Sequence, residues 1–536
     1  MGTRIPADSD PQLATVQLLD DPDSEQGTCG ESSVDVLIVL DGDSGSDGAS
    51  RPGAVHPDHE QAGGRTVTGS QSITTENTEF IILSFEGPDS YSMAGGLGVR
   101  VTNLARTLAD VGFPVHHIFV GDPKQKGEEV SNGGRLVLHR WCQWISEYYP
   151  DGLYQGENEK LYDFNESVPW FVVEHVAKPA MAQGKMLVIM GEEWHTAEAM
   201  SRISDLLFAN GLRDRAVMFW NANNTFSFDR INWGRLTYTT TITTVSRYMK
   251  QVMWGMGLNP LVIPNGIPSA LLDEVDQKAV AQLTKSLGAD LILSKVARWD
   301  PDKRWNMAVE AVARLKDKGL RTVLLARGGL EPHGEEVMHN ARSLGLTVEH
   351  ATTDGNRLED YLQAIAEHRD ADLLNIAFYC PQEFLRIIYN ASDLVLANSG
   401  HEPFGLVGLE AMAAGGIPVT GCTGEDYAVH FFNAIVLETS DPAEIEGYVA
   451  YLEEHPREKE RIRAAAKRTA ALFTWEEVIG NLTRKLEYQA RIQGLLSIPT
   501  RTRVLELRPA EREEAAPVSG LLHRLPRLKP ILLGSA

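Results

Sequence analysis

Short apolar runs alternate with helically spaced apolar positions over most of the chain. The apolar run at 79–87 ends in a glycine and precedes a glycine-rich stretch, a helix pattern that ends near Gly112, and a second apolar run at 115–121. The apolar positions of the helix pattern recur at helical spacing: Leu97, Val101, Leu104, Ala105 and Leu108. A strand, a glycine-rich turn, a helix and a strand in this order predict a βαβ unit and a parallel sheet.

The same alternation is repeated in the second half of the chain. Strand patterns such as "LILSKVARWD" and "DLVLANSG" are separated by amphipathic helix patterns such as "RWNMAVEAVARLKDKG". Between the halves, the stretch 260–272 is punctuated by Pro264, Gly266 and Pro268, which predicts a hinge. The expected fold class is α/β, with two tandem Rossmann-like domains, each a doubly wound parallel sheet, facing each other across a cleft. Ligands of such sheets bind at the carboxyl ends of the strands, so the cleft is the expected site.

Both ends of the chain differ in composition from this α/β region. The N-terminal stretch is rich in Asp, Ser, Gly, Thr and Pro and is predicted to be mostly disordered, although an apolar island at 34–40 has a strand pattern that leaves packing and recognition both open. The basic, leucine-rich C-terminal end could contact a membrane surface or a partner, although two prolines interrupt it. The expected organisation has five parts: a disordered acidic and Gly/Ser-rich extension at 1–76, an N-terminal Rossmann-like domain at 77–262, a C-terminal Rossmann-like domain at 263–475, a helix at 476–496 packing back on the N-terminal domain, and a loose tail at 497–536.

Charge and composition argue against several classes of protein. The formal net charge of −23 argues against general binding to the phosphate backbone of nucleic acids, although a local basic pocket stays possible. No apolar run reaches the roughly 18 residues of a transmembrane helix, and no secretory signal is visible, so a cytoplasmic location is expected. The cysteines form no Cys-x-x-Cys pair, which predicts reduced thiols with no zinc site and no disulfide framework. They lie far apart: Cys29, Cys142, Cys380 and Cys422.

A glycine cluster marks the first strand-to-helix turn. In "AGGLG", Gly96 and Gly98 lack side chains, so a phosphate could approach the backbone at the positive end of the helix. The cluster is neither a Gly-x-Gly-x-x-Gly dinucleotide fingerprint nor a Gly-Lys-Ser/Thr phosphate loop. A tight turn without a ligand remains the alternative.

Two basic residues lie at a strand-to-helix junction in the second half. Arg298 and Lys303 in "VARWDPDKRW" could stabilise the negative charge that accumulates on a diphosphate leaving group. The alternative interpretation is a pair of solvated surface bases.

Two carboxylates frame the apolar segment "EPFGLVGLE". Glu402 is expected in a loop, Gly405 near the start of the following helix, and Glu410 about two turns into that helix. The helix amides could bind the diphosphate, with one acid on a sugar hydroxyl and the other on a ribose. The alternative is a helix N-terminal acid together with an acid in a buried salt bridge.

Taken in order, these segments resemble a known family. "GGLGVRVTNLARTLADVGFPVHHIF", "GEEWHTAEA", "TTVSRYMKQVM", "VIPNGI", "VARWDPDKRWNMAVEAV" and "FLRIIYNASDLVLANSGHEPFGLVGLEAMAAGGIPV" are similar to segments of retaining glycosyltransferases of the GT-B fold, the large family four with its glycogen and starch synthase relatives. The resemblance covers about residues 78 to 490. It implies an N-terminal acceptor-side domain and a C-terminal domain that binds a nucleotide sugar.

The resemblance also implies roles for individual residues. Arg298 and Lys303 would bind the donor diphosphate, Glu402 would contact the transferred sugar, and Glu410 would hold the nucleotide ribose. The other implied contacts are the backbone amides of Phe404, Gly405 and Leu406 to phosphate or sugar, Gly96 and Gly98 to the diphosphate, and His195 near the reacting sugar. His401, beside Glu402, is a weaker candidate.

Two departures from the family pattern bear on the substrates. "SMAGGLG" lacks the lysine that glucan synthases often carry before the Gly-Gly pair, and Trp220 replaces a typical histidine, which casts doubt on a polymerising glucan synthase and on the donor's base. Asn221, Asn223 and Asn224 are candidates for binding the acceptor, with loop capping as the alternative.

The expected function is transfer of a hexose, with glucose favoured, from a nucleotide diphosphate sugar to a hydroxyl of a sugar, glycan or small molecule, with retention of configuration. No cofactor or metal is expected, and UDP-hexose is favoured over ADP- or GDP-hexose as donor. The sequence does not identify the acceptor or the oligomeric state. A catalytically silent sugar-nucleotide-binding scaffold or sensor is the main alternative. A sugar-nucleotide epimerase or a pyridoxal-dependent phosphorylase is less consistent with the Glu-x7-Glu element and with the absence of a recognisable cofactor lysine.

Overall fold

The computed structural model describes residues 72–497. The strand pattern at 34–40, nearly all of the N-terminal extension and the C-terminal tail with its suggested membrane contact lie outside the described residues. No helix within 72–497 combines the length and apolar character needed to cross a membrane. Among the described cysteines, Cys142, Cys380 and Cys422 are all free thiols.

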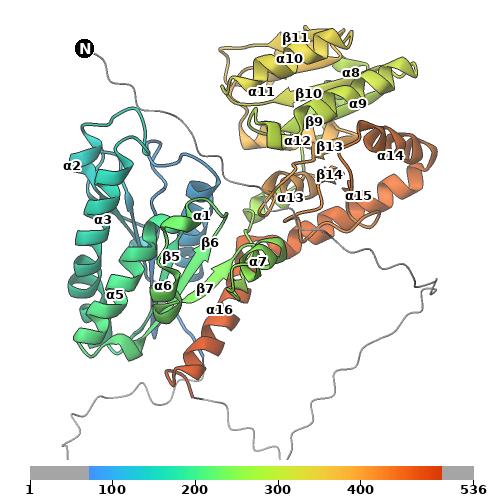
Figure 1. Cartoon of the computed structure of the whole chain (residues 1–536). Helices are drawn as coiled ribbons and strands as arrows, with labels where there is room; N and C mark the ends of the chain where they lie inside the picture. Colours follow the sequence, from blue (N-terminus) through green and yellow to red (C-terminus); the bar gives the residue numbers. More distant parts are fainter. Residues whose placement is uncertain (1–71, 498–536) are drawn as a thin grey trace, which may run out of the picture. The chain divides into compact units, whose positions relative to one another are not determined.

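The N-terminal domain is built on an eight-stranded sheet with the order β3-β4-β2-β1-β5-β6-β7-β8 (Figure 1). Its strands are β1 (Thr78–Leu83), β2 (Val115–Val120), β3 (Glu128–Ser131), β4 (Leu136–Trp141), β5 (Met186–Glu192), β6 (Ala216–Ala222), β7 (Thr241–Thr244) and β8 (Leu261–Val262). All pairs are parallel except the edge pair β3 and β4, which is antiparallel. That edge hairpin was not expected, because β3 is short and largely exposed and gives no buried apolar run.

Helices cover both faces of this sheet. They are α1 (Gly96–Val111), α2 (Gln143–Ser146), α3 (Glu157–Phe171), α4 (Lys178–Ala182), α5 (Ala197–Ala209), α6 (Trp233–Thr239) and α7 (Arg247–Trp254). Alternate residues of β1 point to opposite faces: Ile81 and Leu83 pack in the core with α3 and α5, whereas Phe80 and Ile82 pack in the core with α1. All six residues of β1 are buried, as in a strand covered on both faces.

The C-terminal domain repeats this architecture on a seven-stranded, entirely parallel sheet with the order β11-β12-β10-β9-β13-β14-β15. Its strands are β9 (Leu291–Val296), β10 (Thr322–Arg327), β11 (Val348–Ala351), β12 (Leu373–Ile376), β13 (Leu394–Ala397), β14 (Pro418–Thr420) and β15 (Ile435–Val436). Its helices are α8 (Gln277–Leu287), α9 (Trp305–Asp317), α10 (His333–Ser343), α11 (Leu358–Ala366), α12 (Gln382–Ala391), α13 (Leu406–Ala413), α14 (Pro442–Glu454) and α15 (Pro456–Ala470). The predicted α/β class with two tandem parallel sheets is therefore confirmed.

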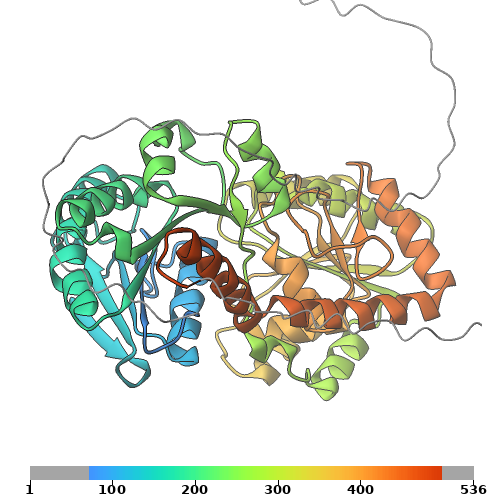
Figure 2. The ribbon, with the colours of Figure 1, turned by 90° about the horizontal axis from the view of Figure 1, so that it is seen from below.

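The chain passes between the two domains twice, and the two passages lie side by side. Ile267 in the linker donates its amide to Phe473 O at 2.9 Å, and the Trp475 amide donates to Ile267 O at 3.0 Å. Gly266 is required at this crossing, since a Cβ atom there would lie 2.7 Å from the Trp475 ring. The last helix, α16 (Trp475–Ile492), buries Val478, Leu482 and Leu486 in the same core as β1 and α1 of the N-terminal domain (Figure 2).

Candidate active site

Two loops at the carboxyl ends of neighbouring strands form one wall of a large cavity. The loop after β9 supplies Arg298 and Lys303, and the loop after β13 supplies Glu402 and Phe404. The cavity measures about 640 Å³, and residues of the N-terminal domain and the linker also line it: Gly96, Leu97, Asn223, Asn224, Phe226 and Asn265. The position agrees with the rule that ligands bind at the carboxyl ends of parallel strands.

The cationic part of the cavity includes an ion pair. Lys303 Nζ lies 2.7 Å from Glu402 Oε2, and the two side chains are only 18% and 23% exposed. Arg298 is exposed to the cavity, and its backbone carbonyl accepts a hydrogen bond from Trp305 Nε1 at 2.8 Å, which ties its loop to α9. The structure therefore brings Arg298, Lys303 and Glu402 together. His401 also lines this cavity, although it is largely exposed and contacts Asp302.

A buried lysine that the sequence analysis did not single out lies beneath these residues. Lys295 is 1% exposed, and its Nζ donates to Asn398 Oδ1 at 2.6 Å and to Leu396 O at 3.2 Å. Burial lowers the pKa of Lys295 to about 7, with Lys303 contributing in the same direction and Glu402 opposing it. Lys295 also lines the cavity. The signal in the sequence is a lysine inside the apolar run "LILSKVA", where a charge is costly unless it serves a purpose.

The first turn of α13 faces the same cavity. Phe404, Gly405 and Leu406 line it, and Gly405, which caps the helix with φ at 75°, leaves no side chain bonded to the first amides. A Cβ atom on Gly405 would lie 2.7 Å from Glu425, so glycine is required for both its backbone conformation and its contacts. The unsatisfied amides at the start of a helix are suited to bind an anion.

Glu410 does not lie with Glu402 on the wall of this cavity. It is on α13, partly buried, and is not among the residues that line the 640 Å³ space. Burial raises the pKa of Glu410 to about 7, and a hydrogen bond from Gln382 opposes this. The carboxyl groups of Glu402 and Glu410 are therefore in different environments.

An acidic side chain occupies the N-terminus of α1, where the sequence analysis placed a phosphate. Glu86 Oε2 accepts hydrogen bonds from Gly95 N at 2.9 Å and Gly98 N at 2.8 Å. Gly98 is buried, and its amide is already bonded to this carboxylate, so a diphosphate would have to displace Glu86 to reach it. Gly96 does line the cavity, with open space where a side chain would be.

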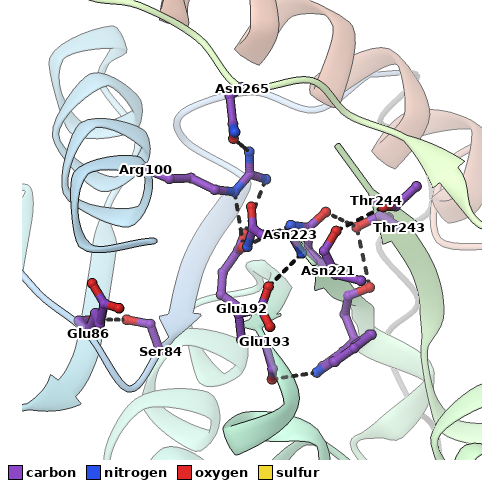
Figure 3. Close-up of polar contacts among 12 residues, drawn as sticks. Ser84, Glu86, Arg100, Glu192, Glu193, Asn221, Asn223, Thr243, Thr244 and Asn265 are labelled. Atoms are coloured by element: carbon purple, nitrogen blue, oxygen red, sulfur yellow. Dashed lines mark hydrogen bonds and ion pairs between the residues drawn. The ribbon is translucent and has the colours of Figure 1, made fainter. Parts of the chain in front are cut away.

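A buried polar network joins α1, β5 and the linker (Figure 3). Arg100 Nε lies 3.0 Å from Glu192 Oε2, and Arg100 also donates to the side chain of Asn265. Glu192 accepts further hydrogen bonds from Asn221 Nδ2 at 2.9 Å and Asn223 Nδ2 at 3.0 Å. Because Arg100 and Glu192 are 2% and 0% exposed, each is the other's main charge compensation.

The three asparagines therefore have different surroundings. Asn221 is buried and bonded to Glu192 and Thr243, so the expectation that it binds an acceptor is wrong: it is a structural residue. Asn223 and Asn224 both line the large cavity. Trp220 is also buried, with its Nε1 donating to Glu193 O at 3.0 Å.

His195 lies in a second cavity of about 430 Å³ in the N-terminal domain, which shares Leu97, Asn224 and Phe226 with the first. The His195 ring stacks on Trp194 at 3.9 Å and on Phe85 at 4.2 Å between centroids. Burial lowers the pKa of His195, although its hydrogen bond to Glu157 opposes this. The imidazole is therefore uncharged at neutral pH.

Glu193, which precedes Trp194, has a strained backbone at the edge of this second cavity. Its φ is 66° and its ψ 167°, a conformation that only glycine adopts readily. Its Oε1 accepts a hydrogen bond from Asn223 N at 2.6 Å, and burial raises the pKa of Glu193 to about 8, with neighbouring Glu192 acting in the same direction. Such strain is typical of functional sites. No cluster of three or more His, Cys, Asp or Glu side chains within 72–497 is arranged to hold a metal ion.

The C-terminal domain matches a known enzyme family. Residues 277–469 match the model of the family "Glycosyl transferases group 1". A D-inositol 3-phosphate glycosyltransferase from Geodermatophilus obscurus is 26% identical over 297 residues, which are 54% of this chain and 59% of the relative. The chain thus spans less than two thirds of the length of these curated relatives. Its match to the D-inositol 3-phosphate glycosyltransferase from Thermomonospora curvata covers 26% of that relative's length.

Solved structures identify the fold as GT-B. Sucrose-phosphate synthase from Thermosynechococcus elongatus aligns with 76% of this chain and 99% of its own at a TM-score of 0.52 and 17% identity. The catalytic domain of starch synthase IV from Arabidopsis thaliana, bound to ADP and acarbose, aligns with 78% of this chain and 99% of its own at a TM-score of 0.53 and 16% identity. The Anabaena protein Alr3699/HepE in complex with UDP-glucose aligns with 76% and 99% at a TM-score of 0.51 and 16% identity.

Proposed function

We propose that this protein is a retaining glycosyltransferase that moves a hexose from a nucleotide diphosphate sugar to an acceptor hydroxyl. The single observation that supports it most is the 640 Å³ cavity, where Lys295, Arg298 and Lys303 meet Glu402 and the first turn of α13. Three cationic side chains and free helix amides suit a diphosphate, and a carboxylate beside them suits sugar hydroxyls. The HepE structure, named for its complex with UDP-glucose, supports UDP-hexose as the favoured donor.

In the proposed reaction the bond between the sugar's anomeric carbon and the diphosphate oxygen breaks, and the electron pair leaves with the diphosphate. Lys303, Arg298 and the amides of Gly405 and Leu406 stabilise that charge. The acceptor hydroxyl attacks the same face of the sugar and passes its proton to the departing phosphate oxygen, which explains why no separate general base is needed. The cationic side chains supply the charge that a metal would otherwise provide, so we propose a metal-independent reaction.

Glu410 is proposed to meet the donor at a different point from Glu402. A further cavity of about 470 Å³ opens at the carboxyl ends of β10 and β12, lined among others by Arg327, Phe378 and Tyr379. We assign the nucleoside to this side of the C-terminal domain. Glu410 lines neither this cavity nor the 640 Å³ one, so its proposed role in binding ribose hydroxyls rests on the resemblance of the Glu-x7-Glu element.

The direct test is a panel of UDP-, ADP- and GDP-hexoses, assayed for release of the nucleoside diphosphate with and without cell-extract acceptors, followed by mass analysis of products. Release that depends on the acceptor, unaffected by a chelator, is the expected result. Tight binding of a nucleotide sugar without turnover across the whole panel would contradict the proposal and favour the scaffold or sensor.

Lys303→Met is expected to lower the rate of transfer by about 10²-fold, because it removes one cation from the developing charge on the leaving group. Steady-state rates with saturating donor measure this. Lys316→Met is the matched control, since Lys316 pairs with Asp372 on the surface of the same domain. A rate within twofold of the unmodified enzyme for Lys303→Met would remove its assigned role.

Binding of a nucleoside diphosphate is expected to take up protons at pH 8. Lys295 is mostly neutral there, because burial lowers its pKa to about 7, and an anion bound above it raises that pKa again. The affinity for UDP should therefore fall as the pH rises above 7. Titration calorimetry in buffers of different ionisation enthalpy measures the uptake, to which nearby Glu425, whose pKa burial raises to about 8, also contributes.

The matched variant is Lys295→Met, which should lose part of the proton uptake and bind UDP with less dependence on pH. The pH dependence of the stability of this variant gives an independent test of the lowered Lys295 pKa. Because the unfolded chain binds the Lys295 proton more tightly than the folded chain, the unmodified protein gains stability between about pH 7 and the ordinary lysine pKa, and the methionine variant does not. Equal uptake in both proteins would show that Lys295 is not coupled to the anion.

A further inference from the structure

The two adjoining cavities differ in their charged residues. The larger one is lined by both signs of charge: Lys295, Arg298 and Lys303, and also Asp300, Asp302 and Glu402. Among the described residues that line the 430 Å³ cavity, none is lysine or arginine, and three are glutamates. These lining residues are Glu86, Leu97, Tyr154, Glu157, Glu193, Trp194, His195, Asn224 and Phe226.

The shared walls place the second cavity beside the proposed donor. Leu97, Asn224 and Phe226 line both spaces. A molecule in the smaller cavity is therefore next to the bound diphosphate sugar, which is the position that an acceptor must take. This inference rests on the proposed function.

None of the three glutamates has a lysine or arginine beside it among the residues that line this cavity. Glu86 accepts hydrogen bonds from two backbone amides and from Tyr154 Oη at 2.6 Å. The hydrogen bond from His195 lowers the pKa of Glu157, so this carboxyl group also stays ionised. Glu193, with its pKa raised to about 8, is largely protonated at neutral pH and can donate to a hydroxyl.

Arg230 contacts two residues of this cavity but does not line it. Arg230 stacks over the Trp194 ring with Cζ 4.1 Å from its centroid, and its Nη1 lies 3.9 Å from Glu157 Oε2. It lines a separate pocket of about 160 Å³, which shares Trp194 and His195 with the 430 Å³ cavity. Its charge is directed to Glu157, and it is not placed to bind a phosphate group in the 430 Å³ cavity.

The remaining walls suit a small polyol. Tyr154, Trp194 and Phe226 provide aromatic surface on which a sugar ring can pack. His195 is 4% exposed, its Nε2 is 2.9 Å from Glu157 Oε1, and its Nδ1 is buried without a hydrogen-bond partner. Because Nε2 carries the proton toward the carboxylate, Nδ1 is an unused acceptor for a ligand hydroxyl or amine.

We propose that the acceptor is a polyol of about the size of one sugar ring that carries no phosphate group, and that amine-bearing acceptors are preferred over phosphorylated ones. An amine gains from Glu86 and Glu157, whereas a phosphate would be held against two carboxylates in a partly enclosed space. Like charges juxtaposed in this way are strongly unfavourable. The curated relatives, in contrast, are named for D-inositol 3-phosphate.

The test compares binding within matched series on the full chain, with and without saturating UDP. One series is glucosamine, glucose and glucose 6-phosphate, and the other is inositol and D-inositol 3-phosphate. Titration by calorimetry or ligand-observed NMR should rank glucosamine first, and the two phosphate esters should bind at least about 100-fold more weakly than glucosamine. A phosphate ester that binds as tightly as glucosamine overturns the proposal, and so does failure of every compound to bind.

A variant of Glu157 tests whether the charge of the cavity, rather than its shape, causes this preference. Glu157→Gln should reduce the ratio of glucosamine to glucose 6-phosphate affinity by about tenfold while glucose changes little. Glu159→Gln is the control, because Glu159 is exposed on the same first turn of α3 and does not line the cavity. A ratio that is unchanged in Glu157→Gln overturns the assignment of the carboxylate.

The measurements with and without UDP distinguish a failure of the proposed function from a failure of the inference about the acceptor. If UDP does not bind, the proposed function fails, while the ranking of sugars without UDP still reports on the second cavity. If UDP binds and the ranking is reversed, only the inference about the acceptor fails.

Discussion

Replacing Glu402 with glutamine is expected to abolish transfer, with a loss of about 10³-fold in rate, while leaving the protein folded. Glu402 lies in the loop after β13 and is the carboxylate nearest to the cationic side chains of the 640 Å³ cavity. Glutamine keeps the shape of the side chain but removes the charge that, in the proposed reaction, binds sugar hydroxyls and balances a positively charged sugar in the transition state. Rates of sugar transfer with saturating donor measure the loss.

The same variant should bind UDP at least as well as the unmodified protein. In the described structure Lys303 Nζ is held 2.7 Å from Glu402 Oε2, and a diphosphate has to compete for that lysine. Removing the carboxylate's charge releases Lys303, so loss of turnover together with unchanged or tighter binding of UDP is the signature of the assigned role.

Stability provides the control for Glu402→Gln. Because the ion pair is partly exposed, its loss should lower the free energy of unfolding by no more than about 1 kcal/mol. Glu359→Gln, an exposed acid on α11 of the same domain, should affect neither rate nor binding. Near-normal turnover in Glu402→Gln would contradict its place in the chemistry.

The fold was largely predictable because each strand and helix carries its own periodicity. The run at 79–87 and the helix pattern that follows it define a βαβ unit without any long-range information. The antiparallel pairing of β3 with β4 was not predictable from the sequence. β3 is four residues long and exposed, and its pairing is decided by its neighbour rather than by its own pattern.

The site was predictable only where residue type and local sequence together restrict the chemistry. Arg298, Lys303 and Glu402 lie on loops after strands, and strand ends meet at one edge of a parallel sheet, so their proximity follows from the topology. Glu86 could not be anticipated at the start of α1, because its hydrogen bonds to Gly95 and Gly98 depend on how the loop after β1 turns back.

The roles of buried charged and polar side chains were also not predicted correctly from the sequence. Lys295 has the strongest sequence signal, a lysine inside an apolar strand, yet its purpose depends on Asn398 and Leu396, which are more than a hundred residues away. Asn221 has the opposite problem: an amide near aromatic residues suggests sugar binding, but its partners Glu192 and Thr243 in neighbouring strands make it structural.

Replacing Arg100 with methionine is expected to lower the free energy of unfolding by about 3–5 kcal/mol, the cost of leaving a buried carboxylate without its cation. Arg100 and Glu192 are both almost fully buried, and the Arg100 guanidinium also bonds to Asn265 in the linker that lines the large cavity. Denaturant unfolding followed by circular dichroism measures the change. The destabilised linker should also weaken binding of UDP, although Arg100 does not itself line that cavity.

Two comparisons decide whether the loss comes from unpaired charge. Adding Glu192→Gln to Arg100→Met should restore part of the lost stability, because the uncompensated carboxylate is then gone and Asn221 and Asn223 can still bond to the amide oxygen. Arg202→Met, which breaks the partly exposed pairs of Arg202 with Glu198 and Glu166 in the same domain, should cost no more than about 1 kcal/mol. If Arg100→Met and Arg202→Met lowered the free energy of unfolding equally, burial of the Arg100–Glu192 pair would not be the cause of the loss. A double variant less stable than Arg100→Met alone would instead place the stabilising role on Glu192 and its asparagine partners, independent of the arginine.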